Sequence, residues 1–158
     1  MFLDLANGNK AVDSVRSFLD SSGGLNSTGG LINQGTTLEP FLTLNTIIPV
    51  DGNYRVYWDF VWSYNQGSQD FISEIQVNGN AITEQRQEPK DVAGGGIVLD
   101  VIGGGTTNTG TNQRYMAGGS SVVALIAGPL ALRIVFAGST NNDEAAIYRA
   151  QLAVEIFS

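Results

Sequence analysis

The sequence predicts an all-β protein: a two-sheet antiparallel jelly-roll sandwich of about eight strands, preceded by an N-terminal arm with a short helix. Runs of alternating apolar and polar residues recur from about residue 39 to the end of the chain, and glycine-containing turns separate them. No strand–helix–strand pattern of an α/β fold interrupts them. A chain of 158 residues suits one such domain, which we place at residues 39–158.

Residues 1–38 have a different composition, and we expect them to form the arm. Asn7 or Asn9 is positioned to cap a helix over residues 10–20, and a segment rich in Gly, Ser and Asn follows. Two interpretations stay open: a disordered terminus, or an arm that becomes ordered on neighbouring subunits. The second uses the apolar residues of the arm as contacts: Val12, Val15, Phe18, Leu19, Leu25, Leu31 and Ile32.

The clearest strand is predicted at residues 54–64, after an extended segment over residues 41–50 and a turn at Gly52. Successive side chains of a strand point to opposite faces, so its large residues form one apolar face. We expect this face to build the core with apolar residues of two late strands: Tyr54, Val56, Trp58, Phe60, Trp62, Leu132, Ile134, Leu152 and Val154.

The remaining strands are separated by recognisable turns. Asn78-Gly79 is the strongest hairpin signal and joins strands over residues 71–77 and 81–86. Glycine triplets flank a short strand at residues 97–102. Three strands follow at residues 120–127, 130–137 and 145–157. In the last of them, even-numbered residues are expected to share one buried face: Ala146, Tyr148, Ala150, Leu152, Val154 and Ile156.

Composition excludes several classes of function. The net charge is −7, and the eight basic residues are scattered along the chain, so neither nucleic acid nor an anionic membrane is an expected partner. The chain has no Cys and no His, which rules out disulfides, thiolate metal sites and His-dependent catalytic triads. We expect no cofactor. Only 15% of residues are charged, a composition that suits crowded protein assemblies.

The polar face of the aromatic strand is the candidate subunit interface. Tyr57 lies between Arg55 and Asp59, and Tyr and Arg are enriched at interfaces. Arg133 and Arg149 of later strands are added to this interface, either in pairs between subunits or as ordinary surface pairs. Trp58 and Trp62 are residue types that stack on sugars, but their shared apolar face favours core packing.

Three weaker signals have simpler explanations. The oxygen-rich residues 141–144 resemble a calcium loop in composition, but their spacing favours a polar turn. Glu84 and Glu88 form a possible acid–base pair with no sign of a cleft around them. The glycine triplets lack the Lys-Ser or Lys-Thr of a phosphate-binding loop. We therefore expect no enzyme activity.

Three segments resemble the tumour necrosis factor-like jelly-roll superfamily. Residues 48–54, Ile-Pro-Val-Asp-Gly-Asn-Tyr, resemble its opening segment. Residues 125–132 are similar to its strand–turn–strand near the end, although Gly128-Pro129 replaces a frequent Gly-Asp. Residues 148–155 are similar to its closing strand. The resemblance implies a homotrimer, and it extends to the jelly rolls of tailed-phage capsid decoration (cement) proteins and spike or fibre heads.

These expectations combine into one function with one main alternative; a secreted bacterial jelly-roll lectin or matrix protein is a third, weaker option. The first is a non-enzymatic virion structural protein, a decoration protein that binds the major capsid protein as a trimer and stabilises the shell. It would be made in the host cytoplasm and located on the capsid surface. The alternative is a receptor- or glycan-binding head of a phage fibre or spike, whose recognition loops would include residues 103–114.

Overall fold

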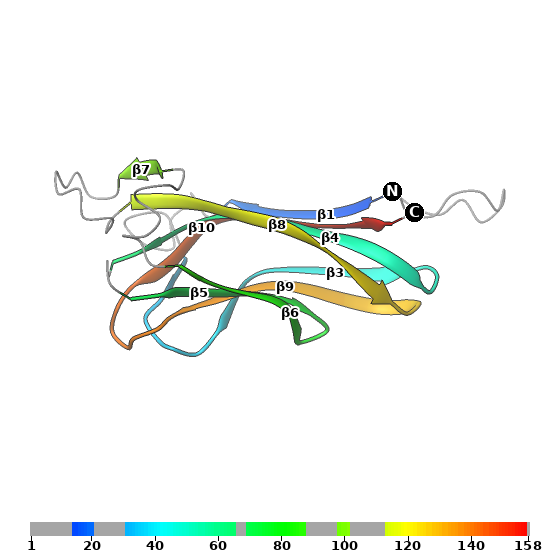
Figure 1. Cartoon of the computed structure of the whole chain (residues 1–158), viewed down its shortest axis with the longest axis horizontal. Coiled ribbons are helices and arrows are strands. Elements are labelled where there is room, and N and C mark those ends of the chain that lie inside the picture. The colour runs from blue at the N-terminus through cyan, green and yellow to red at the C-terminus, as the bar shows by residue number, and fades with distance from the viewer. Residues whose placement is uncertain (1–13, 21–30, 66–68, 88–97, 102–112, 158) are drawn as a thin grey trace.

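Two antiparallel sheets stack face to face in this protein (Figure 1). The computed structural model describes residues 14–20, 31–65, 69–87, 98–101 and 113–157. In these residues the strands are β1 (Ser14–Asp20), β2 (Leu31–Asn33), β3 (Glu39–Ile48), β4 (Gly52–Tyr64), β5 (Phe71–Val77), β6 (Asn80–Gln87), β7 (Val98–Val101), β8 (Gln113–Leu125), β9 (Gly128–Gly138) and β10 (Ala145–Ile156).

The strand order is that of a jelly roll. One sheet has the order β1-β10-β4-β8-β7, with β2 also paired to β10, and the other has the order β3-β9-β5-β6. The antiparallel pairs are nested: β1 with β10, β3 with β9, β4 with β8, and β5 with β6. A long hairpin folded over on itself gives this pattern. The predicted all-β jelly-roll sandwich is therefore confirmed.

The helix predicted at residues 10–20 is wrong where the structure describes it. Residues 14–20 form β1, which pairs with β10 in the register Val15 to Val154 and Ser17 to Leu152. An isolated helix of this length is marginal, whereas a strand here satisfies the open edge of β10. Tertiary pairing thus overrides the local helical pattern. The division of the chain at residue 39 stays a prediction.

Strand β4 supplies one wall of the core. Its side chains alternate as predicted, and Tyr54, Val56, Trp58, Phe60, Trp62 and Tyr64 are buried. Leu132 and Ile134 of β9 face them from the other sheet, and Leu152 and Val154 of β10 lie beside them. All nine residues expected in the core belong to one buried cluster.

A line of aromatic rings crosses the core from one sheet to the other. Trp62 of β4 lies 4.8 Å from the ring of Tyr115 on β8 and 4.6 Å from that of Phe71 on β5. Phe71 is in turn 6.1 Å from Phe136, whose ring meets Phe41 edge-on at 6.4 Å. Aromatic pairs of this kind contribute about 0.5–1.5 kcal/mol each beyond the area they bury. They fix how the two sheets stack.

A bulge in β10 changes which residues face the core. The register to β4 shifts between Ile147 and Arg149, so Tyr148 is the extra residue. Before the bulge, Ala145 and Ile147 point inward, and after it the even-numbered residues do so. The expectation that Ala146 and Tyr148 share the face of Leu152 is therefore wrong. These two residues form a separate cluster with Val61 on the other side of the sheet.

The Asn78-Gly79 hairpin is confirmed. Both residues have positive φ, 49° and 84°, as a type I′ turn requires. The backbone of Asn78 donates to the carbonyl of Ala131, and the Asn78 Oδ1 atom accepts from the Ala131 N–H. The hairpin is thus held against β9 as well as closed on itself. Among the described residues, no helix is long and apolar enough to span a membrane.

Candidate functional site

A hydrogen-bonded cluster lies on the outer face of β4 and β10. The Tyr57 hydroxyl donates to a carboxylate oxygen of Glu155 at 2.5 Å and accepts from the Arg55 guanidinium at 3.2 Å. The same guanidinium lies 4.5 Å above the ring of Phe157. Arg55 and Glu155 are directly opposite in the strand register. The cluster is half-buried, and its polar groups are already oriented before any partner arrives.

The structure brings four of the five predicted interface residues onto one sheet. Arg55, Tyr57 and Asp59 lie on β4, and Arg149 lies on the neighbouring β10, where it and Asp59 are exposed. Arg133 is exposed on β9, in the other sheet. A single flat contact across β4 and β10 therefore cannot include Arg133.

Beside this cluster the outer face of the same sheet has a buried patch. Val61, Ala146 and Tyr148 pack together there, with the half-buried Ile32 against them. The Tyr148 and Ser63 hydroxyls are 2.8 Å apart, and the Arg114 guanidinium lies 4.0 Å above the Tyr148 ring. The bulge at Tyr148 creates this patch, which residue alternation alone does not predict.

The residues expected to contact neighbours from the arm have mixed positions. Val15, Phe18 and Leu19 belong to β1, and Leu31 and Ile32 to β2, and both strands pair with β10 of the same chain. Val12 and Leu25 lie outside the described residues. Asn33, which ends β2, is buried, and its side-chain amide donates to the carbonyls of Thr37 and Phe136 at 2.8 Å each. These bonds attach the segment after β2 to β9.

One end of the sandwich carries exposed apolar side chains. We call Ile47, Val50, Ile126 and Phe157 the apolar tip; their exposed fractions are 70%, 47%, 80% and 41%. Strand register places them together, because the β3–β4 and β8–β9 connections meet at this end and the N–H of Phe157 donates to the carbonyl of Asn53. The Asp51 carboxylate accepts the Ala127 N–H at 2.7 Å and ties the two connections together.

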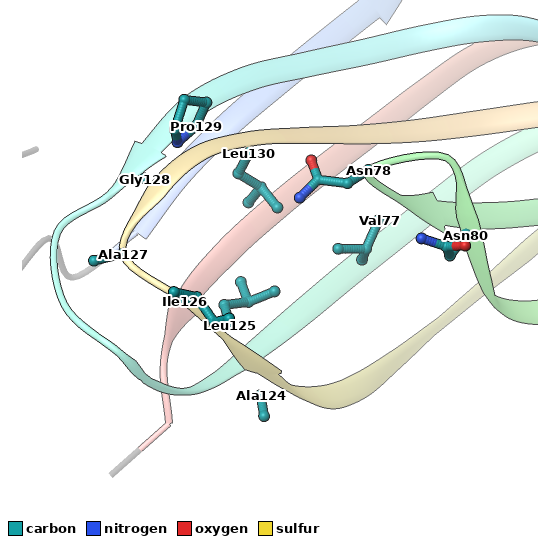
Figure 2. Close-up of a pocket in the computed structure, with 10 residues that line it drawn as sticks. All are labelled: Val77, Asn78, Asn80, Ala124, Leu125, Ile126, Ala127, Gly128, Pro129 and Leu130. Atoms are coloured by element: carbon teal, nitrogen blue, oxygen red, sulfur yellow. The ribbon is translucent and has the colours of Figure 1, made fainter.

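An open pocket of about 310 Å³ adjoins the apolar tip. It lies between the β8–β9 turn and the β5–β6 hairpin, and Figure 2 shows Val77 and Leu130 pointing into it. Asn78 and Asn80 contribute amide groups at its rim, while Leu125 and Ile126 contribute apolar surface. Amides beside apolar surface are groups with which proteins hold small polar ligands.

The other candidate residues are engaged in local structure. Asp143 accepts a hydrogen bond from Thr140, and the N–H of Glu144 donates to the Asn65 side chain, as expected for a polar turn. In the part of the chain that is described, no group of three or more acidic residues is placed to hold a metal. Glu84 lies next to Arg86, and Glu88 is outside the described residues, as are the glycine triplets.

The strand order defines this chain as an antiparallel jelly-roll sandwich. No family model matches the sequence, and no curated protein matches it. Dimeric latent PorU from Porphyromonas gingivalis is structurally similar, with a TM-score of 0.51 and 10% identity over 90% of this chain; the chain spans only 13% of PorU. This likeness shows the fold alone.

Two further structures share less of the geometry. Eiger TNF from S. frugiperda has a TM-score of 0.44 and 11% identity, covering 93% of this chain and 94% of Eiger. A structure of infectious bursal disease virus has a TM-score of 0.44 and 14% identity, covering 90% of this chain and 32% of the viral chain.

Sequence reasoning missed the apolar tip. A signal was present, because Val50 precedes Asp51-Gly52 and Ile126 precedes Gly128-Pro129, so large apolar residues stand at turns where polar ones are usual. Their grouping was not visible, since it depends on the β3–β9 and β4–β8 registers. Two distant turns become neighbours only in the folded chain.

Proposed function

We propose that this protein is a non-enzymatic virion structural protein, a capsid decoration protein that binds the shell as a homotrimer and stabilises it. The observation that carries the proposal is the apolar tip. Ile126 and Ile47 are far more exposed than large apolar residues usually are, and the hydrogen bond from the Ala127 N–H to Asp51 joins the two connections at this end of the sandwich. A rigid sandwich with exposed apolar side chains at one end can bury them in a contact with another protein.

The outer face of β4 and β10 supports the trimer. Arg55, Tyr57 and Glu155 are held in one network, so an interface there loses little side-chain entropy on assembly. The small residues Gly118 and Ser120 of β8 lie opposite Asp59 and Tyr57, which leaves a low, broad surface that a second subunit can approach. The proposal places the trimer contact on this sheet and the shell contact at the apolar tip.

The test is whether the chain is part of a particle. Antibodies raised against the purified protein are used to follow it through density-gradient fractions of cultures that produce the chain naturally. The proposal expects it to band with intact capsids and to leave them on mild denaturation before the shell proteins do. A chain found only in soluble, particle-free fractions would overturn the proposal.

The pocket beside the apolar tip favours the second candidate, a receptor- or glycan-binding head. Asn78 and Asn80 offer amide hydrogen bonds next to the apolar surface of Leu125 and Ile126. Glycan-array binding by the full chain supports this function if it is lost in Asn80→Ala, and binding that is unchanged in that variant places recognition elsewhere. A decoration protein without a glycan role gives no array signal at all.

A further inference from the structure

The free edge of the second sheet is a contact of a different kind. β6 is the last strand in the order β3-β9-β5-β6, and in the described residues no strand pairs with its outer edge. A bulge beside Ile82 interrupts β6, and residues 83–87, which we call the edge segment, are regularly paired to β5. Such an edge presents a row of backbone donors and acceptors.

The side chains of the edge segment offer exposed charges and amides that a partner strand can engage. Glu84 lies directly opposite Glu74 of β5, and like charges in this position destabilise a sheet. Arg86 lies 2.7 Å from Glu84 and 4.0 Å from Asp70, yet the Glu84 and Arg86 side chains are 45% and 56% exposed and can also contact a partner. On the inner side, the amide oxygens of Gln85 and Gln87 are buried and accept no hydrogen bond. A partner strand that carries a cation and amide donors would add a second charge contact to Glu84 and place hydrogen-bond donors beside the two glutamines.

We propose that β6 pairs antiparallel with β6 of a second copy of this chain, about a two-fold axis through Gln85. This register places Glu84 opposite the partner's Arg86, and Arg86 opposite the partner's Glu84. Gln85 meets the partner's Gln85, and Gln87 meets the partner's Thr83, which places amide and hydroxyl donors beside the two glutamine side chains. Among axes through Glu84, Gln85 and Arg86, only this one places opposite charges of the segment Thr-Glu-Gln-Arg-Gln against each other.

Alternative registers are unfavourable. In an antiparallel pair, directly opposite side chains lie on the same face of the sheet. Two identical strands related by a two-fold axis can meet this condition only if one residue lies opposite its own copy. An axis through Glu84 places two carboxylates opposite one another, and an axis through Arg86 places two guanidinium groups opposite one another. The pairing through Gln85 therefore has a defined register, as well as a defined partner.

This contact goes beyond the proposed function, because it lies on the sheet that the proposed trimer face does not use. If the trimer forms through β4 and β10, edge pairing joins one trimer to the next and gives a connected layer. If no trimer forms, edge pairing still yields a dimer. The isolated chain therefore tests it without any particle.

Cross-linking tests the register directly. The chain has no Cys, so Gln85→Cys introduces one thiol, and directly opposite residues of paired strands are close enough for a disulfide. Under mild oxidation we expect a disulfide dimer to form at least about tenfold faster than in Thr43→Cys, an exposed position on β3 at the other edge of this sheet. Equal rates in the two variants would overturn the proposal.

Charge exchange provides a second, independent test of the register. E84R alone places cations opposite cations, and R86E alone places carboxylates opposite carboxylates, so each should self-associate about tenfold more weakly. A one-to-one mixture restores opposite charges on both sides of the axis and should associate as the unmodified chain does. Sedimentation measures all three samples. Restoration in the mixture supports the register, and its absence contradicts it.

Discussion

Gly119 of β8 occupies a position where one methyl group would collide with the core. A Cβ atom there would lie 2.7 Å from Cζ2 of Trp58 and 3.1 Å from Cε2. Trp58 is itself buried, so its ring cannot swing away without disturbing its neighbours. The close approach of backbone to ring explains a glycine inside a strand, where glycine is otherwise unfavourable.

Gly119→Ala should lower the free energy of unfolding by about 1–3 kcal/mol, the usual cost of overpacking. Urea unfolding followed by tryptophan fluorescence measures it. Gly52→Ala is the matched control, because its nearest neighbour would be 3.8 Å away and its backbone is not in the left-handed region. Equal stability of the two variants would show that Trp58 yields more easily than its burial suggests.

The ionisation of Tyr115 is expected to lower the free energy of unfolding at alkaline pH. Burial raises the pKa of its phenol above the ordinary value of 10.0. The unfolded chain then releases this proton at a lower pH than the folded chain, so the contribution of Tyr115 is complete below about pH 10 and is lost as the pH rises further. Between about pH 9 and pH 11, the free energy of unfolding of the Tyr115→Phe variant should therefore fall less than that of the unmodified chain.

Urea midpoints at the two pH values provide the measurement. A Tyr115→Phe protein whose midpoint falls in parallel with that of the unmodified chain would contradict the assignment. The comparison rests on the difference between two pH values, so a constant loss of packing from the missing hydroxyl does not affect it.

At the scale of elements, β1 has the least predictable role. It comes from a segment that local pattern assigns to a helix, yet its pairing with β10 supplies the outermost pair of the nested jelly roll. The expected consequence is that residues 14–20 belong to the folded unit. Residues 14–20 are then not part of a separate arm.

Deleting residues 1–20 should therefore lower the free energy of unfolding by about 3 kcal/mol or more, because it exposes a long edge of β10. Deleting residues 1–12 should change it by no more than about 0.5 kcal/mol. Chemical denaturation of the two truncated chains makes the comparison. If both are as stable as the full chain, β1 contributes nothing to the sandwich.

Features that depend on short-range sequence pattern were predictable, whereas features that depend on long-range strand pairing were not. The alternation of β4 and the Asn78-Gly79 turn depend on short-range pattern, which the sequence displays directly. β1 and the bulge at Tyr148 depend on pairing with strands far along the chain. The same limit applied to the candidate site: Arg55, Tyr57 and Asp59 were grouped correctly on one strand, whereas assigning Arg133 to the correct sheet required the strand order.

At the scale of the whole molecule, the proposed trimer should have a mass of about 50 kDa by light scattering, three times the 16.7 kDa of one chain, when it is measured in the E84R background that weakens β6 edge pairing. In that background Tyr57→Asp adds a carboxylate beside Glu155 on the proposed contact face and should reduce this mass to that of one chain. Arg133→Asp is the control, since it adds a carboxylate to the other sheet and should leave the trimer intact. Identical masses for the two variants would exclude a contact through Tyr57.

The apolar tip makes a separate prediction about particle binding. Ile126 is 80% exposed, so Ile126→Asp should change stability by no more than about 0.5 kcal/mol while abolishing attachment to capsids. Thr43→Asp is the control, because Thr43 is exposed on β3, outside both the apolar tip and the proposed trimer face. Co-sedimentation with purified particles compares them. Capsid binding that survives in Ile126→Asp would exclude the tip as the attachment surface.

The nesting of the strand pairs also governs when the molecule can form. Because β10 (Ala145–Ile156) lies between β1 and β4, the first sheet lacks a central strand until residues 145–156 leave the ribosome. Contacts between the two ends of a chain form slowly, and an unfinished chain exposes two unpaired edges and an aromatic core. Synthesis that stops before β10 therefore yields an aggregation-prone fragment, and only chains that contain β10 can fold and assemble.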